Sequence, residues 1–220
     1  MGVMVTPACA VASTGQMKVL FLGNSHTYVN NVPQLVRSLG LTASRPVDMN
    51  VESVSGGHLE DLARQPGLIK RIQEGHYDYV VLQAAMVSQS HKHEYSHDGA
   101  VEIARVAVAA RTKVLMFPEW SRRGIDETEY TERVYRGIVG RARGAVAPVG
   151  RVWDKVRGHY PLELWAPDGN HASLAGSFLA ANVLFRWLVD DGKTVTTFRP
   201  SGVSRVQADL FQAEIGRAHV

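Results

Sequence analysis

The sequence predicts an α/β fold, a three-layer α/β/α sandwich around a central, mostly parallel sheet of about five strands. Short apolar runs alternate along the chain with longer segments whose apolar residues recur every three or four positions. The short runs are apolar throughout, which is typical of strands buried on both faces of a parallel sheet. Helices should therefore cover both sides of the sheet.

The first half of the chain supplies three strands and two helical segments. Strands are predicted where β-branched and apolar residues cluster, at 18–22, 47–54 and 78–82. A helix is predicted over 32–39, because its apolar residues lie three or four apart. The segment 59–72 also has a helical pattern, which Pro66 interrupts.

The second half continues the alternation. Helices are predicted over 98–111, 127–143 and 172–189. A fourth strand at 114–117 is stopped by Pro118, and 147–149 is a candidate for a short fifth strand. Gly176 lies inside the last helix, which indicates either close packing against another element or mere tolerance of glycine there.

The composition indicates one globular domain. The 220 residues are 45% hydrophobic, enough for a sizeable core, and we place the domain at 17–213. Residues 1–16 are expected to be a leader or the remnant of an export signal, and 214–220 a possible non-native tail. The chain is then cytoplasmic, or exported if the leader is a truncated signal peptide.

Charge and cysteine content narrow the classes of partner. The formal net charge of +3 is too small to argue for nucleic acid, and the arginines between 133 and 143 suit a solvated helix face. Cys9 is the only cysteine, which excludes an intrachain disulfide and a thiolate metal cluster. No run approaches the roughly 18 apolar residues of a membrane span. A small molecule is the expected partner, and the oligomeric state is left open.

Polar or flexible residues directly follow three of the predicted strands. Ser25 follows the first strand, the pair Gly56-Gly57 the second, and Gln83 the third. Because parallel strands end at one edge of the sheet, these residues should gather there. Far along the chain, Asp168 and His171 lie three positions apart, just before a helical pattern. Each motif alone is also explained by ordinary turn or helix-cap chemistry.

Together these residues point to an activated alcohol nucleophile. A serine hydroxyl needs a base, and His171 is the candidate, with Asp168 orienting its ring. His26 is a rival base, but neighbouring side chains on an extended turn tend to point apart. The backbone N–H groups of Ser25 and Gly56 are candidate donors to the oxyanion of a tetrahedral intermediate.

These four blocks, in this order, resemble the SGNH (GDSL-type) hydrolase superfamily. The resemblance runs from Lys18 to about Ala181 and implies a flavodoxin-like α/β/α domain without a cofactor. It implies Ser25 as nucleophile, Asp168 and His171 as its partners, and Gln83 as a third oxyanion donor in place of the family's asparagine. The sequence Gly-Asn-Ser-His also departs from the family's Gly-Asp-Ser.

Other residues are candidates for the pocket or for packing. His26, Gly57, Glu119 and Trp120 are expected to line the substrate pocket, and Trp120 has an equally good role in the core. The segment 90–97 contains His91, His93, Glu94 and His97, side chains that are able to bind zinc. They lie in a loop whose spacing no helix fixes, so no metal is expected.

The function that follows is hydrolysis of small carboxylic esters, with acetylated carbohydrates as a candidate class suggested by the resemblance. An acyltransferase would share the same acyl-enzyme, so the sequence does not separate the two. A carbohydrate-binding or otherwise inactive protein that keeps the fold is the alternative from another class, because glutamine replaces asparagine at position 83.

Overall fold

The computed structural model describes residues 16–189 and 194–216, and in this part of the chain five strands form one parallel sheet. Its spatial order is β2-β1-β3-β4-β5. The strands are β1 (Met17–Gly23), β2 (Met49–Ser55), β3 (Tyr79–Leu82), β4 (Lys113–Met116) and β5 (Ala145–Val146). The chain runs from β1 out to β2 and then crosses to β3 on the other side of β1, so strand order reverses at β1, where doubly wound proteins bind ligands.

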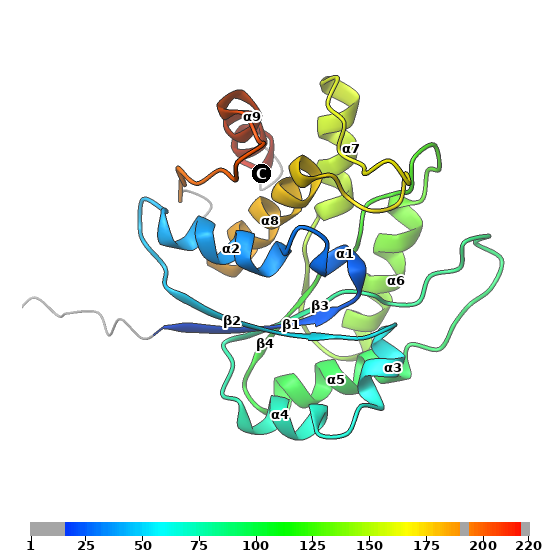
Figure 1. Cartoon of the computed structure of the whole chain (residues 1–220). Helices are drawn as coiled ribbons and strands as arrows, with labels where there is room; N and C mark the ends of the chain where they lie inside the picture. The colour runs from blue at the N-terminus through cyan, green and yellow to red at the C-terminus, as the bar shows by residue number, and fades with distance from the viewer. Residues whose placement is uncertain (1–15, 190–193, 217–220) are drawn as a thin grey trace, which may run out of the picture.

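Helices cover both faces of the sheet, as the sequence predicts (Figure 1). One layer contains α2 (Val32–Leu41), α7 (Val149–His159) and α8 (Leu174–Val189), with α9 (Arg205–Gly216) packed against α7 and α8. The other layer contains α3 (Leu59–Ala63), α4 (Leu68–Glu74), α5 (Asp98–Ala109) and α6 (Thr128–Arg141). The three-layer α/β/α sandwich is therefore confirmed.

The alternation of side chains along the strands divides the core into two parts. In β1, Val19 and Phe21 pack with α2, α7 and α8, whereas Leu20 and Leu22 pack with the second layer. All four side chains are fully buried. Since successive strand residues point to opposite faces, one continuous apolar run serves both cores.

Several element boundaries differ from the sequence predictions. The interruption at Pro66 is confirmed, since it separates α3 from α4. The short fifth strand lies at Ala145–Val146 instead of 147–149, because the chain already turns at Pro148 into α7. Helices α1 (Ser25–Tyr28), α7 and α9 were not predicted, although α7 carries buried apolar residues at helical spacing.

The described part of the chain extends slightly beyond the expected domain at its C-terminal end. Helix α9 runs past residue 213 to Gly216, and Glu214 and Ile215 are buried. Residues 1–15 and 217–220 of the expected leader and tail lie outside the described residues.

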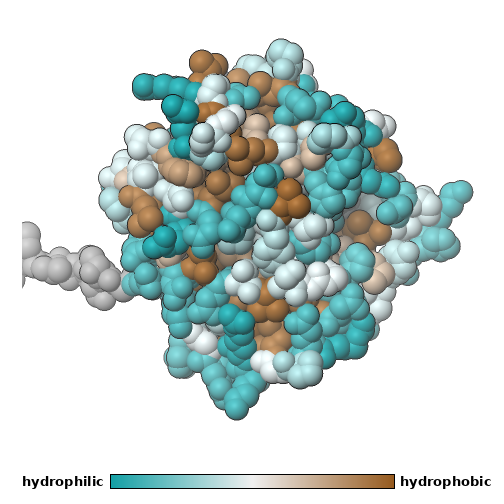
Figure 2. All heavy atoms as spheres, in the orientation of Figure 1, coloured by the Kyte–Doolittle hydropathy of each residue, from teal (hydrophilic) through white to brown (hydrophobic). Residues whose placement is uncertain are grey.

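Across 16–189 and 194–216, no helix has the length and apolar character to cross a bilayer. The face seen in Figure 2 is mostly hydrophilic, with apolar residues in scattered patches.

Candidate active site

The turn after β1 presents Ser25 at the carboxyl edge of the sheet. Asn24 caps the short helix α1, because its side-chain oxygen accepts a hydrogen bond from the backbone N–H of His26 at 3.1 Å. Ser25 is the first residue of this helix and is exposed. Gly23 leaves no room for a larger residue: an added Cβ would lie 2.4 Å from Thr27 Oγ1 and 2.7 Å from Gln83 Oε1.

Gln83 supports this turn from the end of β3. Its side chain is fully buried, and its Oε1 accepts hydrogen bonds from the backbone N–H of Asn24 at 3.0 Å and from the Thr27 hydroxyl at 2.9 Å. Its Nε2 is buried and has no hydrogen-bond partner among the described residues. Two donors of the turn that carries Ser25 thus orient the Gln83 amide, while its own Nε2 donor remains unpaired within the described residues.

The loop before α8 carries Asp168 and His171. The Asp168 Oδ1 accepts hydrogen bonds from the backbone N–H groups of Asn170 and His171, both at 2.9 Å. Its Oδ2 lies 2.6 Å from His171 Nδ1. The hydrogen bond from His171, followed by the two backbone donors, lowers the pKa of Asp168 to about 2. The carboxylate is therefore ionised at neutral pH and holds the ring with Nδ1 protonated.

The structure brings this loop to the Ser25 turn. His171 Nε2 lies 2.8 Å from Ser25 Oγ, although the two residues are 146 positions apart. The proximity expected from the sequence is confirmed. The three side chains form a continuous chain of hydrogen bonds from carboxylate to imidazole to hydroxyl. Such a chain is able to transfer the serine proton to the imidazole.

The backbone N–H of Gly56, an expected oxyanion donor near Ser25, is already hydrogen-bonded. The N–H of Gly56 donates to the Gly23 carbonyl oxygen at 3.0 Å and continues the pairing of β1 with β2. It is therefore not free for an oxyanion. Within the described chain, the N–H groups of Ser25 and Gly57 donate no hydrogen bond. Gly57 is exposed, and its N–H is a candidate donor in place of that of Gly56.

His26, the rival candidate for the base, lies beside His171. Its ring stacks on His171, with centroids 5.2 Å apart and planes 29° apart, and its other neighbour is Trp120 at 5.4 Å. Its Nδ1 lies 3.3 Å from Asn24 Oδ1. Burial lowers the pKa of His26, an effect that the charge of Glu119 opposes. The ring is therefore neutral at pH 7 and packs between the base and the tryptophan.

A pocket of about 160 Å³, with both polar and apolar residues in its wall, adjoins the nucleophile turn. Its wall includes His26, Glu119 and Trp120, together with residues from the loops after β2 and β3. Gly57, which was also expected there, does not line this pocket. Trp120 also packs in the core, where it stacks on Trp153 and donates from Nε1 to the Asn170 carbonyl oxygen. Trp120 therefore lies both in the core and in the wall of this pocket.

The structure also shows a polar residue that sequence analysis missed. Tyr135 is fully buried, and its hydroxyl accepts hydrogen bonds from the backbone N–H groups of Ala84 and Ala85 and donates to Glu119 Oε2 at 2.7 Å. In the sequence Tyr135 looks like an ordinary core position of a helix. Only its contacts reveal that it connects the loops after β3 and β4.

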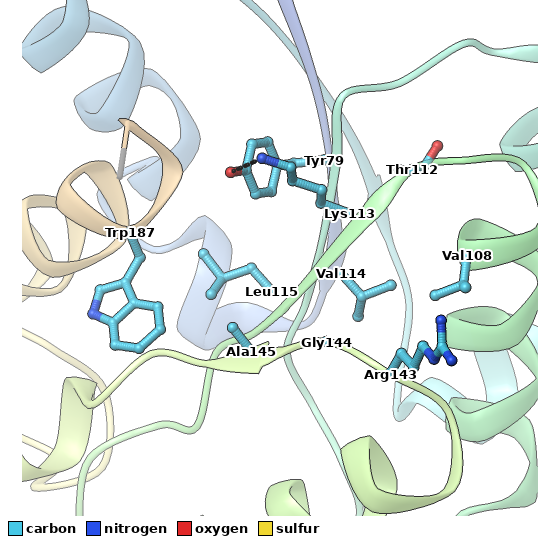
Figure 3. A pocket seen from close by; sticks show the side chains of 10 residues that line it. All are labelled: Tyr79, Val108, Thr112, Lys113, Val114, Leu115, Arg143, Gly144, Ala145 and Trp187. Carbon is cyan, nitrogen blue, oxygen red and sulfur yellow. Dashed lines mark hydrogen bonds between the residues drawn. The ribbon is translucent and has the colours of Figure 1, made fainter. Parts of the chain in front are cut away.

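A larger cavity, of about 450 Å³, has none of these residues in its wall, and Figure 3 shows the side chains that line it. It is lined by residues at the amino ends of β3 and β4, among them Tyr79 and Lys113, and by Trp187 of α8. The functional groups of parallel sheets gather at the carboxyl ends, and Ser25 is at that opposite edge. The smaller pocket is therefore the relevant one.

The histidine-rich loop does not gather into a metal centre. The His91 ring stacks on Tyr130 at 4.2 Å, and its Nε2 lies 3.7 Å from Glu127. Within 16–189 and 194–216, no group of three or more histidine, cysteine, aspartate or glutamate residues is placed to hold a metal ion. The loop instead borders the pocket through Gln89.

No protein-family model matches the chain, and no curated protein matches it. Solved structures do match. A Slackia heliotrinireducens protein assigned to the SGNH hydrolases superposes with a TM-score of 0.58 at 24% identity, over 78% of this chain and 98% of that one. The chain has the fold of the SGNH hydrolases.

Two further structures with this fold were found. A DUF4886 family protein from Bacteroides uniformis has a TM-score of 0.64 at 17% identity, covering 93% of this chain and 95% of that one. A catalytic mutant of an acetylxylan esterase from Geobacillus stearothermophilus has a TM-score of 0.58 at 15% identity, covering 78% and 94%. At these identities the likeness establishes the SGNH fold, and the function is argued from the site.

Proposed function

We propose that this protein is a serine esterase that hydrolyses small carboxylic esters through an acyl-enzyme on Ser25. The observation that carries the proposal is the 2.8 Å distance between Ser25 Oγ and His171 Nε2, with Asp168 at 2.6 Å from the other ring nitrogen. Ser25 is exposed, so a substrate carbonyl is able to reach it. The names of similar structures add acetylated carbohydrates as a candidate substrate class.

In the proposed reaction Ser25 Oγ attacks the ester carbonyl carbon while its proton passes to His171 Nε2. The backbone N–H groups of Ser25 and Gly57 stabilise the resulting oxyanion. His171 then gives its proton to the departing alkoxide, leaving the acyl group on Ser25. A water molecule next loses a proton to His171 and attacks the acyl carbon, and the return of that proton to Ser25 releases the acid.

Two variants test the proposal. We expect Ser25→Ala to abolish hydrolysis of p-nitrophenyl acetate and His171→Ala to lower its rate by several orders of magnitude. His91→Ala is the matched control, since its ring contacts Tyr130 away from Ser25, and it should keep the wild-type rate. Mass spectrometry after treatment with a fluorophosphonate should show one adduct, on Ser25.

Absence of an adduct on the folded protein, together with no ester turnover, would contradict the proposal and favour an inactive binding protein. Adding an acceptor alcohol during turnover separates hydrolysis from acyl transfer. A hydrolase releases free acid at the same rate, whereas an acyltransferase forms the new ester at the acid's expense.

A further inference from the structure

The pocket beside Ser25 lies on a definite side of the nucleophile. His171 enters the site from the segment before α8, in the layer of α2, α7 and α8. The pocket begins beside the base, at Asn170 and His26, and extends towards the loops after β2 and β3 and towards α6, where Thr131 contributes to its wall. A leaving alcohol must face His171 to receive its proton. The far end of the pocket, at Thr131 and the loops after β2 and β3, is then left for the acyl part of the same ester.

The size of the pocket restricts what it holds. About 160 Å³ is below the roughly 300–1,000 Å³ of pockets that hold drug-sized ligands. The pocket therefore suits a small acyl group better than a long one. The wall is also polar, because it includes Glu119 and the ion pair of Arg122 with Glu127.

Glu119 is held rigidly in the wall of this pocket. Tyr135 donates to its Oε2, and burial and the Glu119 charge raise the pKa of Tyr135 far above its usual value, so the phenol keeps its proton. Both lone pairs of that phenol are occupied by Ala84 and Ala85. Ala84 adopts a left-handed backbone with φ of 77°, a conformation that costs alanine energy.

The second carboxylate oxygen of Glu119, Oε1, has no hydrogen-bond partner within the described chain. The cation that lines the same pocket does not neutralise it. Arg122 donates from Nε and Nη2 to both oxygens of Glu127, at 3.0 and 2.8 Å, and is paired there. His26 is neutral at pH 7 because burial lowers its pKa. The pocket therefore presents a hydrogen-bond acceptor and a net negative charge to whatever enters it.

We propose that this pocket binds the acyl group of the ester and that Glu119 selects small acyl groups carrying a hydroxyl or other hydrogen-bond donor. An alkyl group of the same size leaves Oε1 without a partner, and a carboxylate is repelled by it. This inference rests on the proposed esterase function and names the acyl class that the site prefers.

Three methyl esters test it, because they differ only in the group at one position of the acyl chain. Methyl glycolate carries a hydroxyl, methyl propionate a methyl group, and monomethyl malonate a carboxylate. Their kcat/KM values are measured by pH-stat for wild type, for Glu119→Gln and for the control Glu129→Gln, an exposed residue of α6. Comparing ratios between variants cancels the different intrinsic reactivities of the esters.

We expect Glu119→Gln to lower the ratio of kcat/KM for glycolate over propionate by roughly 10–100-fold, since a charge-assisted hydrogen bond is lost. In Glu119→Gln the ratio of kcat/KM for monomethyl malonate over methyl propionate should rise. The control Glu129→Gln should change neither ratio. Unchanged ratios in Glu119→Gln would overturn the inference while leaving the esterase intact. Failure of wild type to hydrolyse even methyl acetate would instead overturn the proposed function.

A second measurement uses wild-type protein alone, in case Glu119→Gln does not fold. Glycolamide and propionamide are neutral analogues of the same two acyl groups and serve as competitive inhibitors of p-nitrophenyl acetate hydrolysis. The inhibition constant of glycolamide should be lower than that of propionamide by about tenfold or more. Equal inhibition constants would contradict a role for Glu119 in acyl selection.

Discussion

At the scale of single residues, Gln83 is the side chain on which the geometry of the nucleophile turn depends most directly. One amide oxygen accepts from both Asn24 and Thr27, and these residues enclose Ser25. The unused Nε2 keeps open the prediction that this amide also donates to the oxyanion. Both roles lie in one buried group, so removing it affects the turn and the chemistry together.

We predict that Gln83→Ala lowers kcat on p-nitrophenyl acetate by roughly 10–1000-fold if the amide supports the oxyanion. The stability of the variant should fall by about 1–3 kcal/mol, because two donors lose their acceptor. Steady-state kinetics and urea unfolding measure the two effects separately. A near-normal kcat with reduced stability would assign Gln83 to the turn alone.

The burial of His26 predicts that the free energy of unfolding depends on pH. Its pKa is lowered in the folded protein from the ordinary value of 6.5, mainly by burial, so the unfolded chain binds more protons just below pH 6.5. Stability should therefore fall as the pH drops through that window. In His26→Phe, which keeps an aromatic ring against His171, the loss of thermal stability between pH 7.5 and 5.0 should be smaller. An equal loss in both proteins would show that His26 does not titrate in this way.

At the scale of elements, the site is assembled from the ends of strands and from one loop. The turns after β1, β2 and β3 carry Ser25, Gly57 and Gln83, and the loop before α8 carries His171, the proposed base. The position of α8 decides whether His171 reaches Ser25. Close packing fixes it: a Cβ on Gly176 would lie 2.2 Å from the Leu164 carbonyl oxygen and 2.5 Å from the Trp153 ring.

We predict that Gly176→Ala destabilises the protein by about 1–3 kcal/mol, since a methyl group would force α8 away from the carbonyl and the ring. Gly137→Ala is the matched control within α6, because its added Cβ meets nothing within 4 Å. It should be neutral or stabilise by about 0.5–1 kcal/mol, the usual gain of alanine over glycine in a helix. Urea unfolding of both variants decides the comparison, and equal effects would contradict the close-packing account.

At the scale of the whole molecule, the C-terminal helix completes the layer that contains the base. Helix α9 packs on α7 and α8, and Glu214 is buried, where it accepts from the Tyr160 hydroxyl at 3.1 Å and pairs with Lys155 at 3.1 Å. These contacts lie beyond residue 213, the boundary of the domain predicted from the sequence.

A chain ending at Ala213 should therefore be less stable than one ending at Gly216 by roughly 2–4 kcal/mol, because it loses the buried Ile215 side chain and the contacts of Glu214. The longer chain keeps every contact described for α9 and serves as the control. The midpoint of urea unfolding measures the difference. Equal midpoints would mean that residues 214–216 are dispensable for the fold.

The sequence predicted much of the fold because strands and helices leave periodic patterns. The apolar runs at β1, β3 and β4 and the break at Pro66 were visible in this way. Helix α1 was missed, since four residues are too few to show a helical period. The two-residue β5 was misplaced for the same reason, and its position is set by pairing with β4.

For the candidate site, residue types and their order along the chain pointed to Ser25, Asp168 and His171, which the structure brings within hydrogen-bond distance of one another. They did not show that the Gly56 N–H is already paired, because that depends on its contact with the Gly23 carbonyl oxygen. Nor did they point to Tyr135, whose role comes from contacts with residues about 50 positions earlier in the chain.

The sequence by itself determined the layered α/β architecture and the chemical groups available at the sheet edge, because local propensity and side-chain chemistry belong to each residue. Only the tertiary structure decided the 2.8 Å contact between Ser25 and His171, the acceptor left open on Glu119, and the place of α9. These are relations between distant segments, and they are set by packing that no local pattern records.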